Sequence, residues 1–242
     1  MNNLLIVGDV HAHLDSLTEI INKYKDKIIA VLQVGDFELY QSEQAITQEI
    51  NYLEKKNKLD SAKRLKRSLL KKSLEPFPVP VYYIKGNHED FDNLDSTFLR
   101  HMNIHYLEQG ETIKIGDRTV AGVGGIYSPV KNTKKSEDLN GHDKRFYTLE
   151  DVNKVLKKRQ TKPIDILITH QACSGVIPEK SKKRYKPFWD EGTKDFVELL
   201  KMPKLRYYIH GHHHVNYRKT YNNIKCIGLG HFGKNKKSHI II

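Results

Sequence analysis

Side chains that can bind metal ions follow short apolar runs at five separate places in this chain. Each run is continuous and rich in branched or aromatic residues, which is typical of a β-strand buried on both faces. In open α/β sheets the ligand crevice lies at the carboxyl ends of the strands, so donors at five strand ends indicate one shared site. The runs cover residues 4–7, 29–34, 79–84, 164–169 and 205–209, and the donors that follow are Asp9, His11, Asp36, Asn87, His88, His170, His212 and His214.

The first third of the chain predicts a parallel βαβ unit with a helical insertion. Leu17 and Ile21 fall at helical spacing between the first two apolar runs, so we expect a helix that returns the chain for a second parallel strand. From about residue 40 to 75 the pattern predicts two charged helices with Ile46 and Ile50 on their apolar stripe. This basic helical insertion is either an ordinary solvated surface or a phosphate-binding face.

The rest of the chain has more segments with the alternating pattern that is typical of β-strands. Alternating residues on both sides of Gly116 predict a hairpin, and a long basic loop follows at about residues 128–147. A structureless loop of this length is typical of a substrate loop or of disorder. A capping-box pattern at Thr148 predicts the start of one helix, and Thr193 opens another. Two further β-segments are expected at residues 217–229 and 238–242.

The charge of the chain indicates which partners it favours. It carries 41 lysine and arginine residues against 29 aspartate and glutamate residues, a formal net charge of +12. This balance favours polyanions, which makes nucleic acid a candidate partner, although many lysine-rich chains are merely soluble. The basic residues gather in the insertion, in the loop and at residues 180–186.

No sequence feature predicts membrane insertion or a disulfide framework. No apolar run is long enough to span a bilayer and no signal-peptide pattern is present, so we expect no membrane partner and a cytoplasmic location. Cys173 and Cys226 are isolated from each other in the sequence and are expected to be small buried hydrophobic residues. The oligomeric state stays open.

The donors at the strand ends favour a pair of divalent ions. Oxygen and nitrogen donors without a thiolate suit Mn²⁺, Fe, Zn²⁺ or Ni²⁺ better than Ca²⁺ or a structural zinc. Seven donors exceed what one ion needs and divide between two ions, which in such sites lie about 3.5–4 Å apart and clamp a phosphate. We expect Mn²⁺ as the metal. The seven donors are Asp9, His11, Asp36, Asn87, His170, His212 and His214.

The order of the motifs, D-x-H, G-D, G-N-H-E, H and G-H-x-H from Asp9 to His214, resembles that of the calcineurin-like metallophosphoesterases. The resemblance implies an α/β (α+β) fold, a four-layer αββα sandwich of two mixed β-sheets flanked by helices, in one domain over residues 1–242. It also implies a catalytic role for His88. The metal ligands that it implies are Asp9, His11 and His214 for one ion, Asn87, His170 and His212 for the other, and Asp36 as the bridge.

Several smaller features also resemble the catalytic core of lariat-debranching-enzyme-like prokaryotic relatives. They are the insertion after Asp36, the hairpin that ends at Tyr127, the basic loop and the Arg145-Phe146-Tyr147 segment before a helix. This chain has Asp9 where the debranching enzyme has a cysteine. The likeness implies a loop on which a nucleic-acid backbone would lie beside the metals.

The expected reaction is attack of a metal-bridging hydroxide on the phosphorus of a phosphodiester, in nucleic acid or a nucleotide, with His88 stabilising the leaving oxygen. A phosphomonoesterase acting on phosphoprotein or a small molecule needs the same metals, and a non-catalytic scaffold with the same fold is the third alternative. Glu89 and Asp90 either orient His88 or are acids at a helix start. The candidate substrate contacts are Tyr127, His142, Tyr147 and His231.

Overall fold

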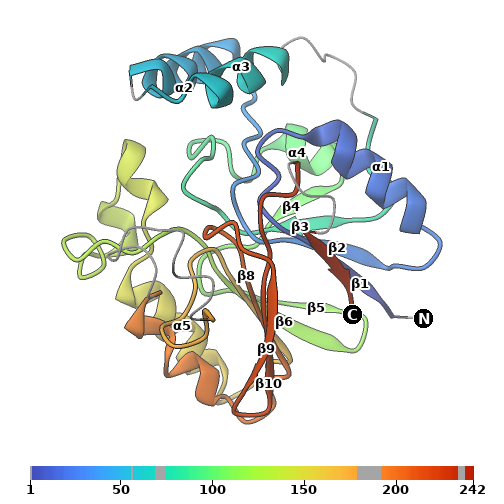
Figure 1. Cartoon of the computed structure of the whole chain (residues 1–242). Helices are drawn as coiled ribbons and strands as arrows, with labels where there is room; N and C mark the ends of the chain where they lie inside the picture. The colour runs from blue at the N-terminus through green and yellow to red at the C-terminus, as the bar shows by residue number, and fades with distance from the viewer. Residues whose placement is uncertain (1, 56, 69–74, 179–191, 234–237) are drawn as a thin grey trace.

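Two mixed β-sheets pack face to face in the computed structural model, which describes residues 2–55, 57–68, 75–178, 192–233 and 238–242 (Figure 1). The first sheet has five strands in the order β11-β1-β2-β3-β4. Strands β1, β2, β3 and β4 are parallel to one another, and β11 is antiparallel to β1. The strands are β1 (Leu4–Val7), β2 (Ala30–Gln33), β3 (Val81–Tyr83), β4 (Ile104–Tyr106) and β11 (His239–Ile241).

The second sheet has six strands in the order β5-β6-β7-β8-β10-β9. The four inner strands are parallel, and the outer two are antiparallel to their neighbours because each is joined by a hairpin. The predicted hairpin around Gly116 is therefore confirmed. The strands are β5 (Thr112–Ile115), β6 (Arg118–Val123), β7 (Ile166–Thr169), β8 (Tyr207–His210), β9 (Tyr217–Tyr221) and β10 (Ile224–Gly228).

Helices cover the outer face of each sheet and complete four layers. The buried strand β1 shows why: Leu4 and Ile6 face the second sheet, whereas Leu5 and Val7 face α1, since successive side chains of a strand point to opposite faces. The predicted αββα sandwich is confirmed. The first sheet is covered by α1 (Leu14–Tyr24) and α4 (Thr97–His101), and the second by α5 (Leu149–Lys158) and the 3₁₀ turns η3 (Lys194–Phe196) and η4 (Leu199–Lys201).

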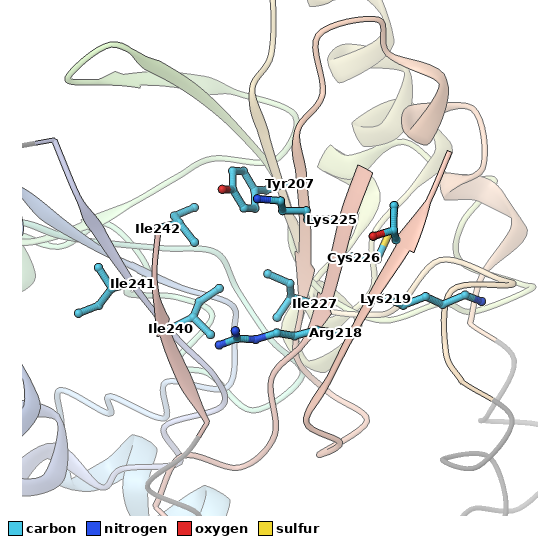
Figure 2. A pocket seen from close by; sticks show the side chains of 10 residues that line it. Tyr207, Arg218, Lys219, Lys225, Cys226, Ile227, Ile240, Ile241 and Ile242 are labelled. Atoms are coloured by element: carbon cyan, nitrogen blue, oxygen red, sulfur yellow. The ribbon is translucent and has the colours of Figure 1, made fainter. Parts of the chain in front are cut away.

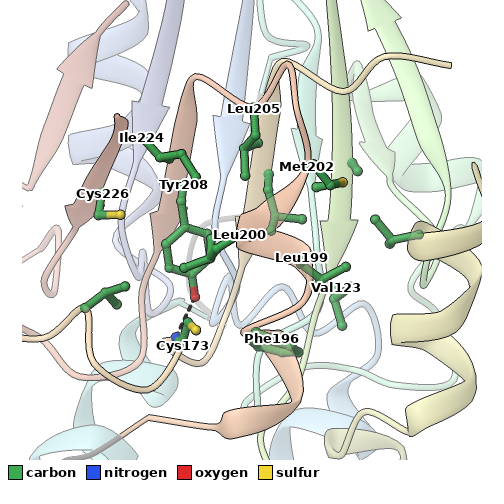
Figure 3. Packing of buried hydrophobic residues seen from close by; sticks show 14 of the residues in the cluster. Val123, Cys173, Phe196, Leu199, Leu200, Met202, Leu205, Tyr208, Ile224 and Cys226 are labelled. Atoms are coloured by element: carbon green, nitrogen blue, oxygen red, sulfur yellow. Dashed lines mark hydrogen bonds between the residues drawn. The ribbon is translucent and has the colours of Figure 1, made fainter. Parts of the chain in front are cut away.

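Figure 3 shows the core between the second sheet and its helices. Tyr208 lies fully buried in it, and the backbone N–H of Cys173 donates a hydrogen bond of 2.7 Å to its hydroxyl. Cys173 and Cys226 are both buried free thiols, as the sequence predicts.

One predicted helix differs from the structure. Residues from Thr193 onward form the two 3₁₀ turns η3 and η4 instead of an α-helix. Phe196, Leu199 and Met202 are all buried, and a spacing of three places side chains on one face of a 3₁₀ turn. The sequence therefore predicted the start at Thr193 correctly and the type of helix wrongly.

The predicted basic insertion consists of two helices, α2 (Glu43–Lys55) and α3 (Leu59–Ser68), that pack on each other at one end of the molecule (Figure 1). Their apolar cluster also contacts Ala12 and Tyr40, so the two helices lie beside the first two motifs. The predicted basic loop contains the short turns η1 (Ser136–Asp138) and η2 (Gly141–Arg145) and is more ordered than expected. The basic segment at 180–186 lies outside the described residues.

Candidate metal centre

Four of the predicted ligands converge at the carboxyl ends of strands from both sheets. One donor atom from each of Asp9, His11, Asp36 and His214 lies within 4.8 Å of the others. Asp9 follows β1 and Asp36 follows β2 in the first sheet, whereas His214 follows β8 in the second. Asp9 and Asp36 are almost completely buried, and carboxylates are rarely buried without a cationic partner. This group could hold one metal ion.

His11 has the tautomer that a ligand needs. Its Nδ1 lies 2.8 Å from Oε1 of the buried Glu38, and because a carboxylate only accepts, Nδ1 must donate. In the neutral ring Nε2 then keeps its lone pair, and it faces His214 Nε2 at 3.1 Å and Asp36 Oδ2 at 3.6 Å. Glu38 therefore orients His11, a role that the sequence analysis missed.

A second group of donors lies on the other side of Asp36. His170 Nδ1 donates to the carbonyl oxygen of Val34 over 2.9 Å, which leaves Nε2 with its lone pair. That Nε2 lies 3.1 Å from Asn87 Oδ1 and 3.4 Å from Asp36 Oδ1. The ring of His212 lies 5.0 Å from that of His170. The structure thus brings Asn87, His170 and His212 together as the sequence predicts.

Asp36 lies between the two groups. Its Oδ1 also accepts hydrogen bonds from the backbone N–H groups of Asn87 and His88. Burial alone would raise the pKa of Asp36, but the neighbouring His170, His88 and His11 hold it far below its usual value, so the carboxylate stays charged. The position and charge of Asp36 suit a carboxylate shared by two cations.

The donor set fits divalent cations. In each group, imidazole nitrogens face carboxylate or amide oxygens at 3.0–3.6 Å, and lone pairs that converge in this way would be stabilised by a positive ion among them. Burial lowers the pKa of His212, and the neighbouring His170 lowers it further, which keeps the ring neutral and able to bind metal.

The backbone is strained where these ligands lie. His11, Asp36, His212 and His214 all have positive φ angles, between 46° and 61°. Such angles are uncommon for residues other than glycine, and strained residues cluster at functional sites where surrounding contacts hold them. Glycines allow the close approach: a Cβ at Gly211 would lie 2.0 Å from Asp9 Oδ1.

The predicted catalytic residue His88 lies at the edge of this cluster. Its ring centroid is 5.9 Å from that of His11, and its Nδ1 lies 3.5 Å from Oε1 of Glu49, a buried residue of α2. Burial lowers the pKa of His88, but the charge of Asp36 and the bond to Glu49 outweigh burial and raise it to about 9. His88 can therefore donate a proton near neutral pH.

Glu89 and Asp90 hold backbone rather than His88. Glu89 accepts hydrogen bonds from the N–H groups of Phe37, Glu38 and Gly86, so it ties the loop after β2 to the loop after β3. Asp90 accepts from the N–H of Gln41 and from the side chain of Asn93. These contacts match neither of the roles left open by the sequence, which were to orient His88 or to act as acids at a helix start.

One predicted substrate contact is wrong. Tyr147 is completely buried against Phe196, and its hydroxyl donates to Thr193 Oγ1 and Asp195 Oδ2. An aromatic ring in a loop segment can serve to anchor the loop to the core, and Tyr147 does so here. Tyr127 is partly buried beside this ring, and its N–H donates to Gln171, the residue after His170.

Of the other two predicted contacts, His231 lies close to the site and His142 contacts the insertion. His231 is buried with its ring centroid 4.5 Å from that of His11 and 5.3 Å from that of His214. His142 is exposed on the basic loop and stacks on Tyr52 of α2, with ring centroids 5.6 Å apart and planes at 29°. The loop and the insertion therefore meet at Tyr52.

A separate pocket of about 440 Å³ lies between β11 and the β8–β10–β9 edge of the second sheet (Figure 2). Lys225 lies over the ring of Tyr207 in its wall, and Arg218 extends toward Ile240. None of the predicted ligands lines it. The convergent donors, and not this cavity, therefore mark the candidate site.

Two facing mixed sheets bring histidines and carboxylates together at their strand ends, an arrangement that suits a metal centre. The chain belongs to the calcineurin-like phosphoesterase family, whose model matches residues 3–216. The family resemblance found in the motifs is therefore confirmed.

Lariat debranching enzymes are among the relatives of this chain. The one from Arabidopsis thaliana is 23% identical over 241 residues, which cover 88% of this chain and 55% of the relative. The one from Schizosaccharomyces pombe is 27% identical over 157 residues, which cover 58% of this chain and 34% of the relative. This chain thus spans about half, or less, of the length of these relatives.

Solved structures share the fold at lower identity. The phosphopantetheinyl hydrolase of Mycobacterium tuberculosis has a TM-score of 0.53 and 10% identity, over 100% of this chain and 95% of that one. Likeness at this identity shows the shared architecture alone. In the part of the chain that the structure describes, every helix is too short or too polar to pass through a bilayer.

Proposed function

We propose that this protein is a dinuclear-metal phosphodiesterase that acts on nucleic acid or a nucleotide, with Mn²⁺ as the preferred ion. The observation that carries the proposal is the position of Asp36 between two groups of donors, each anchored by a histidine whose Nδ1 is already bonded. One ion would be held by Asp9, His11, Asp36 and His214, and the other by Asp36, Asn87, His170 and His212.

The side chains of this protein would bind the metal ions, orient the ligands and donate a proton to the leaving oxygen. Two divalent ions, when bound, lower the pKa of a water molecule and neutralise phosphate oxygens. Glu38 and the Val34 carbonyl fix the two anchoring histidines, so that the donors are arranged before substrate binds. His88 donates a proton or a charge-assisted hydrogen bond to the leaving oxygen of the substrate.

The contact between the insertion and the basic loop supports a nucleotide-containing substrate. Arg145 lies over the ring of Tyr52, with its Cζ 6.0 Å from the ring centroid, and His142 stacks on the same ring. Aromatic faces beside cationic side chains suit single-stranded nucleic acid, because every base has a face that stacks. We propose His142, Tyr127 and His231 as substrate contacts.

Hydrogen bonds and ion pairs hold the basic loop in place. The ammonium group of the buried Lys85 donates to the carbonyl oxygens of Lys144 and Phe146. Lys131 pairs with Asp143, and Lys144 pairs with Asp92. Part of the basic charge of the loop is thus used within the protein, which leaves the Arg145 and His142 contacts as the stronger argument for a substrate face.

Comparing two substrates tests the proposed function. With added Mn²⁺, we expect a bis-aryl phosphodiester to be hydrolysed faster than the matching aryl phosphate monoester. The two reactions need the same metals, so only the substrate differs between them. A faster reaction with the monoester would favour the phosphomonoesterase alternative, and inertness toward both substrates would favour a non-catalytic scaffold.

Salt dependence tests the nucleic-acid part of the proposal. If the basic surfaces bind a phosphate backbone, binding of a fluorescent single-stranded oligonucleotide should weaken steeply with salt, with a logarithmic slope of about 0.7 for each phosphate contacted. Fluorescence anisotropy over a series of salt concentrations measures this slope. A flat response would show that the basic segments do not bind nucleic acid.

A further inference from the structure

The helical insertion reaches the reaction centre through one acidic side chain. Glu49 lies in α2 with its Oε1 3.5 Å from Nδ1 of His88, and the two side chains are only 10% and 17% exposed. We propose that Glu49 is a positioning residue for His88, supplied by the inserted helix. This inference rests on the proposed function and adds to it a residue that lies outside all five motifs.

The position of Glu49 on its helix supports a functional role. Ile46, Ile50 and Leu53 form the buried stripe of α2 that packs against α3, and Glu49 shares their buried face. Burying a carboxylate is costly unless a partner compensates for the lost water. The imidazole of His88 is that partner, so the apolar cluster holds Glu49 where it meets the histidine.

This contact would determine which nitrogen of His88 faces the substrate. A carboxylate only accepts hydrogen bonds, so Nδ1–H of His88 would donate to Glu49, which fixes the orientation of the ring and leaves Nε2 for the leaving oxygen. Glu49 touches neither the substrate nor the predicted ligands, so it acts through His88.

The nearest acidic residues in the sequence have other roles. Glu89 follows His88 directly, but both of its oxygens accept hydrogen bonds from the backbone of the surrounding loops. Asp90 accepts hydrogen bonds from the backbone N–H of Gln41 and from the side chain of Asn93. Among these three acidic residues, Glu49 is the one whose carboxylate contacts the imidazole of His88.

The test uses Glu49→Gln, Glu49→Asp and, as the matched control, Glu54→Gln. Glu54 lies on the same helix, pairs with Lys66 and is 41% exposed. Against aryl phosphodiesters with graded leaving groups, Glu49→Gln should slow poor leaving groups about 10–100-fold, the usual effect of losing such a supporting contact. Good leaving groups, KM and bound metal should be unaffected, and Glu49→Asp should recover part of the rate.

A double-mutant cycle separates positioning of His88 from a general effect on folding. In the His88→Ala background, Glu49→Gln should cause little further loss, because its target is gone. An equal loss with every leaving group, a loss of metal or an undiminished effect in the His88→Ala background would overturn the assignment of Glu49.

A spectroscopic measurement keeps the inference testable if the proposed function fails. In ¹H–¹⁵N spectra of the imidazole groups, Nδ1 of His88 should be protonated in the wild type, and its signal should shift in Glu49→Gln but not in Glu54→Gln. An unchanged His88 spectrum would refute the contact with Glu49. A wild-type protein inert to all phosphodiesters but with this shift would refute only the proposed function.

Discussion

Replacing Asp36 with asparagine is expected to lower kcat by about three orders of magnitude. Asp36 faces His11 on one side and His170 on the other, and the substitution removes the charge that both cations would share. Electrostatic stabilisation by such ions is worth several kcal/mol, and about 1.4 kcal/mol corresponds to a tenfold change in rate. Asparagine tolerates the positive φ of 55° at this position, so the fold should persist.

The measurement for Asp36→Asn is phosphodiester hydrolysis together with the metal content of the purified protein. We expect fewer bound ions than in the wild type. Asp26→Asn removes the same charge from an exposed position near the end of the turn after α1 and should change neither quantity. If Asp36→Asn bound two ions and kept the full rate, Asp36 would not be a shared ligand.

Replacing His88 with alanine is expected to slow the hydrolysis of poor leaving groups by about 10²–10⁴-fold, the usual contribution of a general acid or base. The predicted ligands lie on other side chains, so both ions should remain bound. A good leaving group needs little protonation, and its rate should fall much less. Steady-state rates with a graded series of aryl phosphodiesters measure this difference.

His101→Ala is the matched control for His88→Ala, because His101 is an exposed histidine at the end of α4. It should leave the rates with every substrate unchanged. A His88→Ala protein that retained its rate on poor leaving groups would remove His88 from the proton-donor role, and loss of metal would make it a structural support of the ligands.

The ligand pattern could be predicted from the sequence because buried parallel strands leave continuous apolar runs. The run 4–7 coincides with β1, and the other four runs lie within two residues of a strand at each end. The motif order then implied both groups of donors. What local patterns do not show is that these strands belong to two sheets, because pairing is decided by contacts between residues far apart in the chain.

The supporting residues were missed for a similar reason. Glu38 and Glu49 act through side chains 27 and 39 positions away in the chain, which no local spacing reveals. One signal was present, since Glu49 lies on the apolar stripe of its helix, where a carboxylate needs a partner. Tyr147 shows the opposite error: a ring beside a basic loop was read as a substrate contact, but its hydroxyl is bonded inside the core.

The most direct test of a two-metal site is titration of the metal-stripped protein with Mn²⁺ while hydrolysis of a bis-aryl phosphodiester is followed. If Asp36 is shared between two ions, activity should rise until two equivalents are bound and then remain constant. Full activity at one equivalent, or no hydrolysis by protein with two bound ions, would contradict the proposed dinuclear phosphodiesterase.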